Sequence, residues 1–192
     1  MKELSLNILD LVQNSITAGA GRVTVTVTES EADDRLSVGI EDDGCGMEED
    51  FLRRVTDPFT TTRTTRRVGM GIPLFKMEAE MAGGSFEITS RPGEGTRLSA
   101  SFQLSHLDTP PLGDMAGTVA AIVQSTPDME LYYEHRTDTG EFLFSTAEIR
   151  EALGGVSLSE PAVVEWIGEY VRENEQALRQ QPSRLEGQEE EA

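Results

Sequence analysis

The chain has 192 residues, of which 37% are apolar, so it can bury the core of one ordinary domain with a smaller addition. Its formal net charge of −19 repels a phosphate backbone, which argues against a nucleic acid as partner and in favour of basic protein partners. A single cysteine, Cys45, excludes an intramolecular disulfide, and the absence of a long apolar run or an apolar leader predicts a cytoplasmic protein that does not enter a membrane.

The first predicted element is a helix over about residues 3–18, because apolar residues recur there at helical spacing. Asp10, Asn14 and Ala18 are each four residues apart and share a second, more polar face. An amide oxygen is a hard ligand suited to Mg²⁺, and a carboxylate one turn away can orient or deprotonate water. The alternative interpretation of this face is an exposed polar helix surface.

Two antiparallel strands follow. The first is the valine and threonine alternation of residues 22–28, and the second spans residues 35–40 and runs directly into Glu41-Asp42-Asp43-Gly44-Cys45-Gly46-Met47. An Asp at a strand end can accept a hydrogen bond from an exocyclic amine such as that of adenine. Glycines at alternate positions let the backbone turn and approach a flat ligand closely. Taken alone, this segment is better explained as an acidic turn between a strand and a helix, because Asp-Gly turns are common.

A short helix over residues 48–55 leads into a loop over residues 56–68, which is rich in threonine and arginine. Within the loop, the guanidinium groups of Arg63, Arg66 and Arg67 could pair with phosphates. Gly69-Met70-Gly71 then opens a helix that runs to about Met81. Backbone amides at such a helix N-terminus can hold a phosphate.

Strands over residues 85–90 and 96–104 form a hairpin, and a stiff connector with two prolines follows at residues 106–112. Beyond it we predict a helix over residues 113–124, a hairpin of strands 130–136 and 141–145, a helix over residues 146–153 and a final helix capped by Ser159. The predicted organisation is therefore a domain at residues 1–105, a linker at 106–112, a small α/β extension for docking or regulation at 113–179, and a disordered acidic tail at 180–192.

Five of these blocks, in this order, resemble the N, G1, F, G2 and G3 boxes of the GHKL ATPases. The blocks are Asp10–Ala20, Glu41–Met47, Pro58–Thr62, Gly69–Ile72 and Gly93–Thr96, and the resemblance covers roughly residues 4–104. The family includes histidine kinases, anti-sigma-factor kinases, type II topoisomerases and mismatch-repair ATPases. The resemblance implies an α+β fold, a two-layer α/β sandwich with a mixed, mostly antiparallel sheet known as the Bergerat fold.

The same resemblance implies ATP and Mg²⁺ as cofactors. By position, Asn14 matches the residue that binds Mg²⁺, and Asp42 matches the residue that binds adenine, with Thr96 supporting it through water. Asp10 stands where many hydrolysing members carry a longer Glu as general base. Residues 56–68 match the ATP lid, with Phe59 as its hydrophobic hinge. The full set of implied cofactor contacts is Asn14, Ala18, Asp42, Gly44, Gly46, Met47, Phe59, Thr60, Arg63, Gly69, Met70, Gly71 and Thr96.

Three functions fit this resemblance. The first is a stand-alone protein kinase that phosphorylates a separate protein partner, because we expect the two histidines, His106 and His135, to be surface residues rather than phosphoacceptors. The second is an ATP-sensing regulatory module with little turnover, which the short Asp10 and a proline at position 73 favour. The third is an ATPase that drives a mechanical cycle. The sequence does not indicate the oligomeric state.

Overall fold

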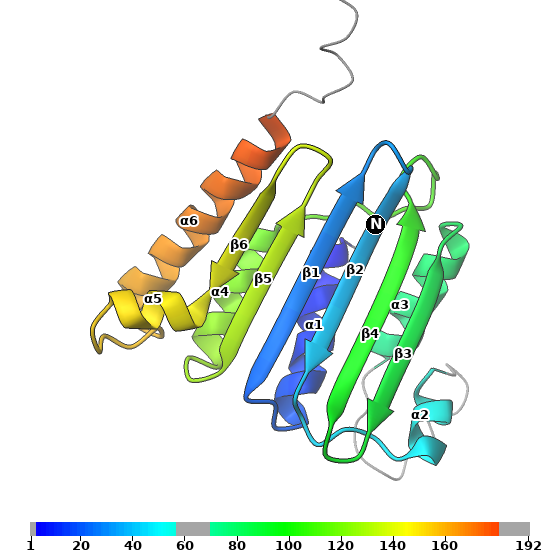
Figure 1. Ribbon diagram of the computed structural model, residues 1–192, viewed down its shortest axis with the longest axis horizontal. Coiled ribbons are helices and arrows are strands. Elements are labelled where there is room, and N and C mark those ends of the chain that lie inside the picture. Colours follow the sequence, from blue (N-terminus) through cyan, green and yellow to red (C-terminus); the bar gives the residue numbers. More distant parts are fainter. Residues whose placement is uncertain (1–2, 57–69, 181–192) are drawn as a thin grey trace, which may run out of the picture.

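The computed structural model describes residues 3–56 and 70–180, which form a two-layer structure (Figure 1). One layer is a six-stranded sheet with the strand order β3-β4-β2-β1-β5-β6. In Figure 1 the sheet faces the viewer, and helices α1, α3 and α4 lie behind it. The elements are α1 (Leu4–Thr17), β1 (Arg22–Ser30), β2 (Arg35–Asp42), α2 (Glu49–Val55), α3 (Gly71–Met81), β3 (Ser85–Arg91), β4 (Gly95–Gln103), α4 (Met115–Ser125), β5 (Glu130–Arg136), β6 (Glu141–Ser145), α5 (Thr146–Ala152) and α6 (Pro161–Gln180).

This architecture confirms the predicted two-layer α/β sandwich. Its sheet is mixed and mostly antiparallel, since β1 pairs antiparallel with β2 and parallel with β5. The predicted lid at residues 56–68 lies outside the described residues except for Thr56, and so does the predicted tail except for Gln180, the last residue of α6.

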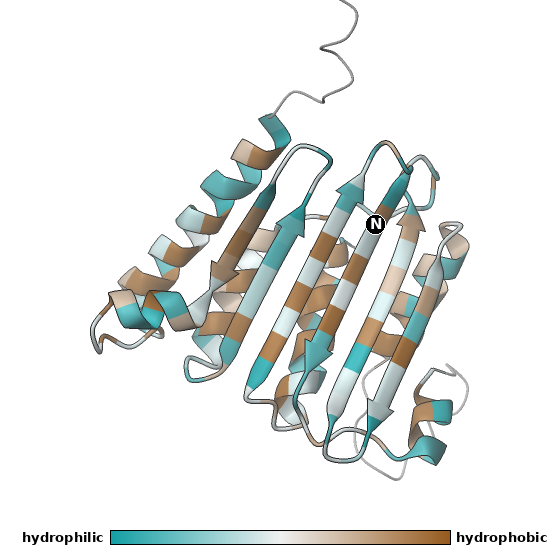
Figure 2. Ribbon diagram, in the orientation of Figure 1, coloured by the Kyte–Doolittle hydropathy of each residue, from teal (hydrophilic) through white to brown (hydrophobic). Residues whose placement is uncertain are grey.

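The central strands owe their position to strict alternation of apolar and polar side chains. In β1 the side chains of Val23, Val25 and Val27 are buried against the helices, while the threonines between them face away. Figure 2 shows the same alternation as bands across β1 and β2. Burying a valine side chain contributes about 1.5–3 kcal/mol, so a shift of one residue in register would reverse the faces at a high cost.

The C-terminal part of the chain continues the same sheet. Strand β5 lies parallel to β1 from the pair Arg22 and Glu130 to the pair Thr28 and Arg136, and β6 pairs with β5 in turn. The sequence places a linker at residues 106–112, yet the hydrogen-bonded ladder runs without interruption from β3 to β6. Residues 113–179 therefore share a sheet and a core with the N-terminal part. Their assignment to docking or regulation stays a prediction.

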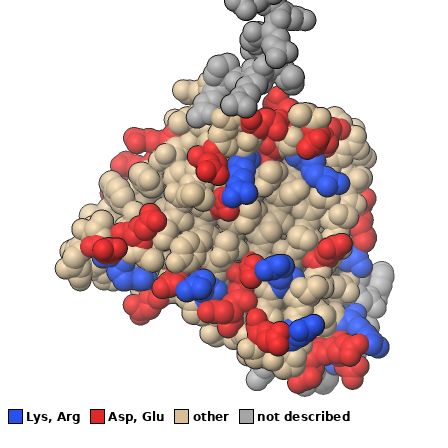
Figure 3. All heavy atoms as spheres, viewed as in Figure 1, with Lys and Arg blue, Asp and Glu red and all other residues tan. Residues whose placement is uncertain are grey.

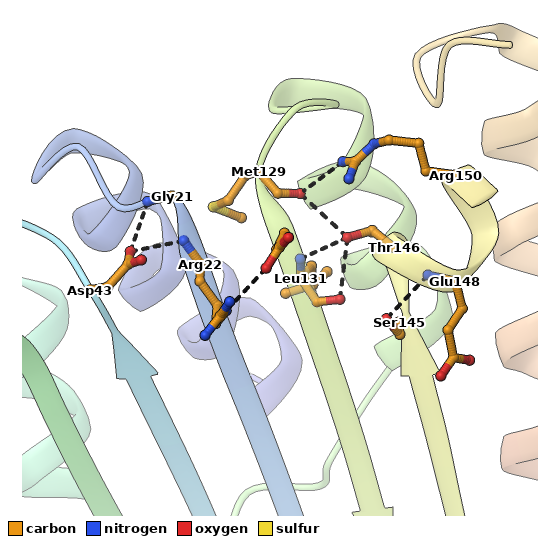
Figure 4. Close-up of polar contacts among 10 residues, drawn as sticks. Gly21, Arg22, Asp43, Met129, Leu131, Ser145, Thr146, Glu148 and Arg150 are labelled. Atoms are coloured by element: carbon orange, nitrogen blue, oxygen red, sulfur yellow. Dashed lines mark hydrogen bonds and ion pairs between the residues drawn. The ribbon is translucent and has the colours of Figure 1, made fainter. Parts of the chain in front are cut away.

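Polar contacts fasten the two parts together at one end of the strands (Figure 4). The carboxylate of Asp43 accepts hydrogen bonds from the backbone N–H groups of Gly21 and Arg22, each at 2.8 Å. The guanidinium of Arg22 then pairs with the carboxylate of Glu130 at 3.0 Å. On the far side of β5, the hydroxyl of Thr146 accepts a hydrogen bond from the Leu131 N–H at 2.8 Å. These contacts connect the ends of β2, β1, β5 and β6.

The prediction that His135 is a surface residue is wrong, because its side chain is only 1% exposed. The Nδ1 atom of His135 lies 2.9 Å from both carboxylate oxygens of Glu175 on α6, and its Nε2 atom lies 3.2 Å from Glu29 on β1. The hydroxyl of Tyr133 donates to the same Glu175 at 2.7 Å. We call Glu29, Tyr133, His135 and Glu175 the buried charge cluster. It attaches α6 to the sheet.

The ionisation of the buried charge cluster follows from these contacts. Burial alone would lower the pKa of His135, but the hydrogen bonds and negative charges of Glu175 and Glu29 outweigh it and raise that pKa to about 9. The hydrogen bond from His135 lowers the pKa of Glu29. Burial, and then the charge of Glu175, raise the pKa of Tyr133 well above its usual value, so this phenol remains a donor.

The open face of the sheet is covered by side chains of both signs, interspersed with uncharged ones (Figure 3). The negative charge is concentrated late in the sequence: residues 1–105 hold 11 Lys and Arg against 17 Asp and Glu, and residues 106–192 hold 5 against 18. In the described part of the chain, no helix combines the length and the apolarity that a membrane span requires.

Candidate functional site

A cavity opens between helix α1 and the sheet, at the end of β2. Six of the predicted site residues meet there from four separate segments, and Gly46 and Met47 supply the loop after β2. Asn14 and Ala18 come from α1, Asp42 from β2, and Thr96 from β4. The complete lining is Leu11, Asn14, Ser15, Ala18, Ile40, Asp42, Gly46, Met47, Ile72, Ile88, Thr96 and Leu98. Asp42 and Asn14 therefore face one cavity, as the sequence predicts.

The carboxylate of Asp42 is held from two sides. Its Oδ2 atom accepts a hydrogen bond from the hydroxyl of Ser15 at 2.6 Å, and its Oδ1 atom accepts one from the backbone N–H of Gly44 at 2.9 Å. Each carboxylate oxygen can accept more than one hydrogen bond, so a further donor can still bind. The two contacts fix the direction of the carboxylate, and a ligand amine would meet a pre-oriented acceptor.

Strand register brings Thr96 to Asp42. The two residues are directly opposite each other in the β2–β4 ladder. The Thr96 hydroxyl lies 3.0 Å from the Ser90 hydroxyl, which also donates to the Gly95 carbonyl at 2.8 Å. The same Ser90 oxygen accepts the backbone N–H of Met47 at 2.9 Å. Ser90 thus ties the loop after β2 to the β3–β4 turn behind the cavity.

The glycines at positions 44, 46 and 95 are required by the packing of the chain around Asp42. Gly46 has a φ of +66°, and a Cβ there would lie 1.9 Å from the Arg91 carbonyl oxygen. A Cβ at Gly95, which has a φ of +87°, would lie 1.9 Å from the Asp42 carbonyl oxygen. A Cβ at Gly44 would lie 3.0 Å from the Cβ of Ala18. These positions therefore need glycine so that three backbone segments can pack together around Asp42.

Much of the cavity lining is apolar. Ile40 and Leu98 come from the sheet, Leu11 comes from α1, and Ile72 comes from α3. An apolar lining with one oriented carboxylate is suited to a planar ring that carries an amine donor. This arrangement matches the chemistry of a purine base with an exocyclic amino group.

A second group of predicted residues meets where α3 begins. Gly71 lies against α1, so closely that a Cβ there would be 3.6 Å from the Cβ of Asp10 and 3.9 Å from the Nδ2 atom of Asn14. The N-cap residue of α3, Met70, makes no side-chain capping hydrogen bond, and the first N–H groups of a helix can bind an anion. Met70, at the N-cap position, is exposed. Phosphate groups leaving the cavity in this direction would meet both α3 and Asn14.

The donor set fits a magnesium ion that is bound partly by a ligand. Within residues 3–56 and 70–180 no three His, Cys, Asp or Glu side chains gather to hold a metal. Asn14 supplies one amide oxygen, and the exposed carboxylate of Asp10 lies one helical turn away. Mg²⁺ is usually held in proteins by one or two such groups together with phosphates and water.

Sequence reasoning missed Ser15 and Ser90. Ser15 lies on the buried face of α1 and is 4% exposed, and its hydroxyl contacts Asp42. The signal in the sequence is its position next to Asn14. Four predicted contacts, Phe59, Thr60, Arg63 and Gly69, lie outside the described residues.

Comparison with known proteins agrees with this geometry. Residues 2–106 match the family described as histidine kinase-, DNA gyrase B-, and HSP90-like ATPase. The non-motile and phage-resistance protein of Caulobacter vibrioides is 34% identical over 110 residues, covering 53% of this chain and 13% of that protein. The signal transduction histidine-protein kinase AtoS of Escherichia coli is 30% identical over 99 residues, covering 52% of this chain and 16% of that protein.

The chain therefore spans less than a fifth of the length of either relative. Among solved structures, the N-terminal domain of a DNA repair protein aligns with a TM-score of 0.52 at 14% identity, covering 76% of this chain and 53% of that chain. At this identity the likeness concerns the fold.

Proposed function

The chain belongs to the family of histidine kinase-, DNA gyrase B- and HSP90-like ATPases, and on this premise we propose that it binds ATP with Mg²⁺ and transfers the γ-phosphate to a separate protein. The observation that carries the proposal is the meeting of Asp42 and Asn14 on one cavity, which leads toward the N-terminus of α3. The first end suits a purine and the second suits phosphates.

In this proposal the residues have distinct tasks. Asp42, oriented by Ser15 and Gly44, accepts the adenine amine. The apolar lining packs against the ring and excludes water from it. The first N–H groups of α3 bind the phosphates, and Asn14 holds Mg²⁺ beside them. When bound, the ion neutralises charge on the phosphates. Asp10 lies at this end and can accept a proton from an attacking hydroxyl or water.

The burial of His135 supports a separate acceptor protein. His135 is enclosed by two carboxylates in the buried charge cluster and has no access to a nucleotide. Relatives of this chain include a signal transduction histidine-protein kinase. A protein partner with a basic surface would also complement the strong negative charge of the chain.

The test is an ATP titration in Mg²⁺ of the wild type, Asp42→Asn and Asn14→Ala, with Asp33→Asn as the matched control. Asp33 is an exposed carboxylate in the β1–β2 turn, so its change should leave affinity unaltered. Loss of a hydrogen bond to a charged group should weaken ATP binding by Asp42→Asn roughly 10- to 100-fold. Asn14→Ala should weaken Mg²⁺-dependent binding specifically. Unaltered affinity in both variants would remove the proposal.

Transfer of the γ-phosphate is tested separately, by incubating the purified chain with γ-labelled ATP and an extract of the cells that produce it. A labelled partner protein, absent from the reaction with Asp42→Asn, supports the kinase.

The second candidate, an ATP-sensing module, is favoured by one observation: the Asp10 carboxylate is exposed and has no hydrogen-bond partner among the described residues. It predicts very slow ADP release, which Asp10→Glu accelerates, and no labelled partner.

A further inference from the structure

Helices α1 and α3 meet at two points. At the first, Gly71 lies against Asp10 and Asn14, as described above. At the second, the side-chain amide of Asn7 donates a hydrogen bond to the carboxylate of Glu78. On each helix the two points are seven residues apart, which is about 10 Å along the helix axis. Because Asn14 lies near Gly71 and Asn7 near Glu78, the two helices are antiparallel and contact each other at both points.

The buried amide of Asn7 needs Glu78 as its hydrogen-bond partner. Asn7 is only 8% exposed although it is a polar side chain on the helix that carries Asn14. A buried amide without a partner costs about 1–3 kcal/mol, so the position is favourable only with Glu78 beside it. Among the described residues, Glu78 is the side-chain partner that Asn7 has.

The start of α3 has little of its own to fix its position. Its N-cap residue, Met70, makes no side-chain capping hydrogen bond, and its first residue, Gly71, lies against α1 without a side chain. Ile72, Phe75 and Ala79 pack against the sheet and fix the depth of the helix. Apolar packing of this kind fixes the distance between the helix and the sheet, but it resists movement of the helix along the sheet less strongly. A hydrogen bond has a preferred distance and angle, so it also restricts that movement.

We propose that Asn7 and Glu78 are positioning residues for the phosphate end of the nucleotide site, holding the first turn of α3 in register with Asp10 and Asn14. This inference rests on the proposed nucleotide binding. Adenine is held by Asp42 at the other end of the cavity, so the pair governs the affinity contributed by the phosphates and leaves the affinity for the base unaltered.

The experiment compares the affinities of ATP and adenosine, both in Mg²⁺, for the wild type, Glu78→Ala, Glu78→Gln and Glu80→Ala. Glu78→Ala should lose roughly three- to tenfold in ATP affinity, as expected for one hydrogen bond, with adenosine affinity within twofold of the wild type. Glu78→Gln retains an oxygen that can accept from Asn7 and should restore ATP binding. Glu80→Ala removes an exposed carboxylate of the same helix and should change neither.

Three results would overturn the inference. Equal losses for ATP and adenosine would mean that the pair serves stability alone, and unaltered ATP binding by Glu78→Ala would mean that α3 needs no such contact. Failure of Glu78→Gln to recover would assign the effect to charge instead of the hydrogen bond. If Glu78→Ala does not fold, Asn7→Ala carries the same comparison. Absence of ATP binding by the wild type would instead refute the proposed function, and the inference with it.

Discussion

Each half of the molecule holds a carboxylate against the sheet, Asp42 at the end of β2 and Glu175 on α6, but the surroundings of the two differ. Asp42, in the N-terminal half, receives two hydrogen bonds and faces a cavity. Glu175, in the C-terminal half, is 7% exposed and receives hydrogen bonds from Tyr133 and His135 on both of its oxygens. The difference shows which carboxylate can still bind a ligand. Asp42 keeps acceptor capacity toward open space, and Glu175 uses its capacity to hold a helix.

The comparison is tested most strongly by Glu175→Ala. This change leaves the imidazolium of His135 buried with Glu29 alone, so we expect the free energy of unfolding to fall by about 3–5 kcal/mol. Urea denaturation measures the loss. Glu173→Ala, on the exposed side of the same helix, should change it by less than about 0.5 kcal/mol. A loss below about 1 kcal/mol for Glu175→Ala would show that Glu175 does not hold α6 to the sheet, which would contradict the comparison.

The pH dependence of stability should report the same cluster. The pKa of His135 is about 9 in the folded chain, against 6.5 for a free histidine. Because the folded-state pKa is the higher one, protonation favours folding, with the full effect below pH 6.5. Stability should then decrease by roughly 3 kcal/mol as the pH rises through 9. Urea titrations at a series of pH values measure this, and His135→Gln should flatten the decrease. A wild-type curve that is already flat between pH 6.5 and 9 would contradict it.

Around Asp42, in the N-terminal half, stability depends on close packing of backbone segments instead of on buried charges. Gly46→Ala tests this difference. The new Cβ would collide with the Arg91 carbonyl, so we expect about 2 kcal/mol more destabilisation than in Gly93→Ala. Gly93 has a comparable φ of +77° with nothing within 4 Å, which makes it the matched control. ATP affinity should also fall in Gly46→Ala alone. Equal behaviour of the two variants in both measurements would argue against backbone packing as the reason for this glycine.

The smallest expected effect is that of Ser15→Ala. Loss of the hydroxyl frees one oxygen of Asp42 to move, at a cost of about 1 kcal/mol in nucleotide affinity. Thermal melting should barely change, because the carboxylate can reach water in the cavity. Isothermal titration measures the affinity. If Ser15→Ala instead lowers stability and retains nucleotide affinity, Ser15 serves the fold, as Glu175 does in the C-terminal half.

Much of the fold could be predicted because it is encoded in local patterns. The valine and threonine alternation of β1 allows only one buried face, and the glycines around α3 mark its ends. The strands and helices of the C-terminal part were predicted within a few residues of their observed bounds. Its attachment could not be predicted, because the parallel pairing of β5 with β1 joins residues more than a hundred positions apart.

The wrong prediction for His135 has a physical origin. In β5 the alternation that buries Leu131 and Tyr133 also buries His135, and in α6 the spacing that buries Val171 also buries Glu175. Both polar residues therefore lie on apolar faces, where each is acceptable only because the other is present. Sequence periodicity indicates which face a residue shares, but it does not reveal a charge partner forty positions away.

The parallel ladder between β1 and β5 has a practical consequence for recombinant work. A fragment ended at residue 112, where the prolines suggest a boundary, would leave seven residues of β1 without hydrogen-bonded neighbours on one side. A bare strand of alternating valine and threonine is a template for intermolecular pairing. Expression of such a fragment should yield aggregates, so plasmids for crystallography or fusion are best designed to include everything through Gln180.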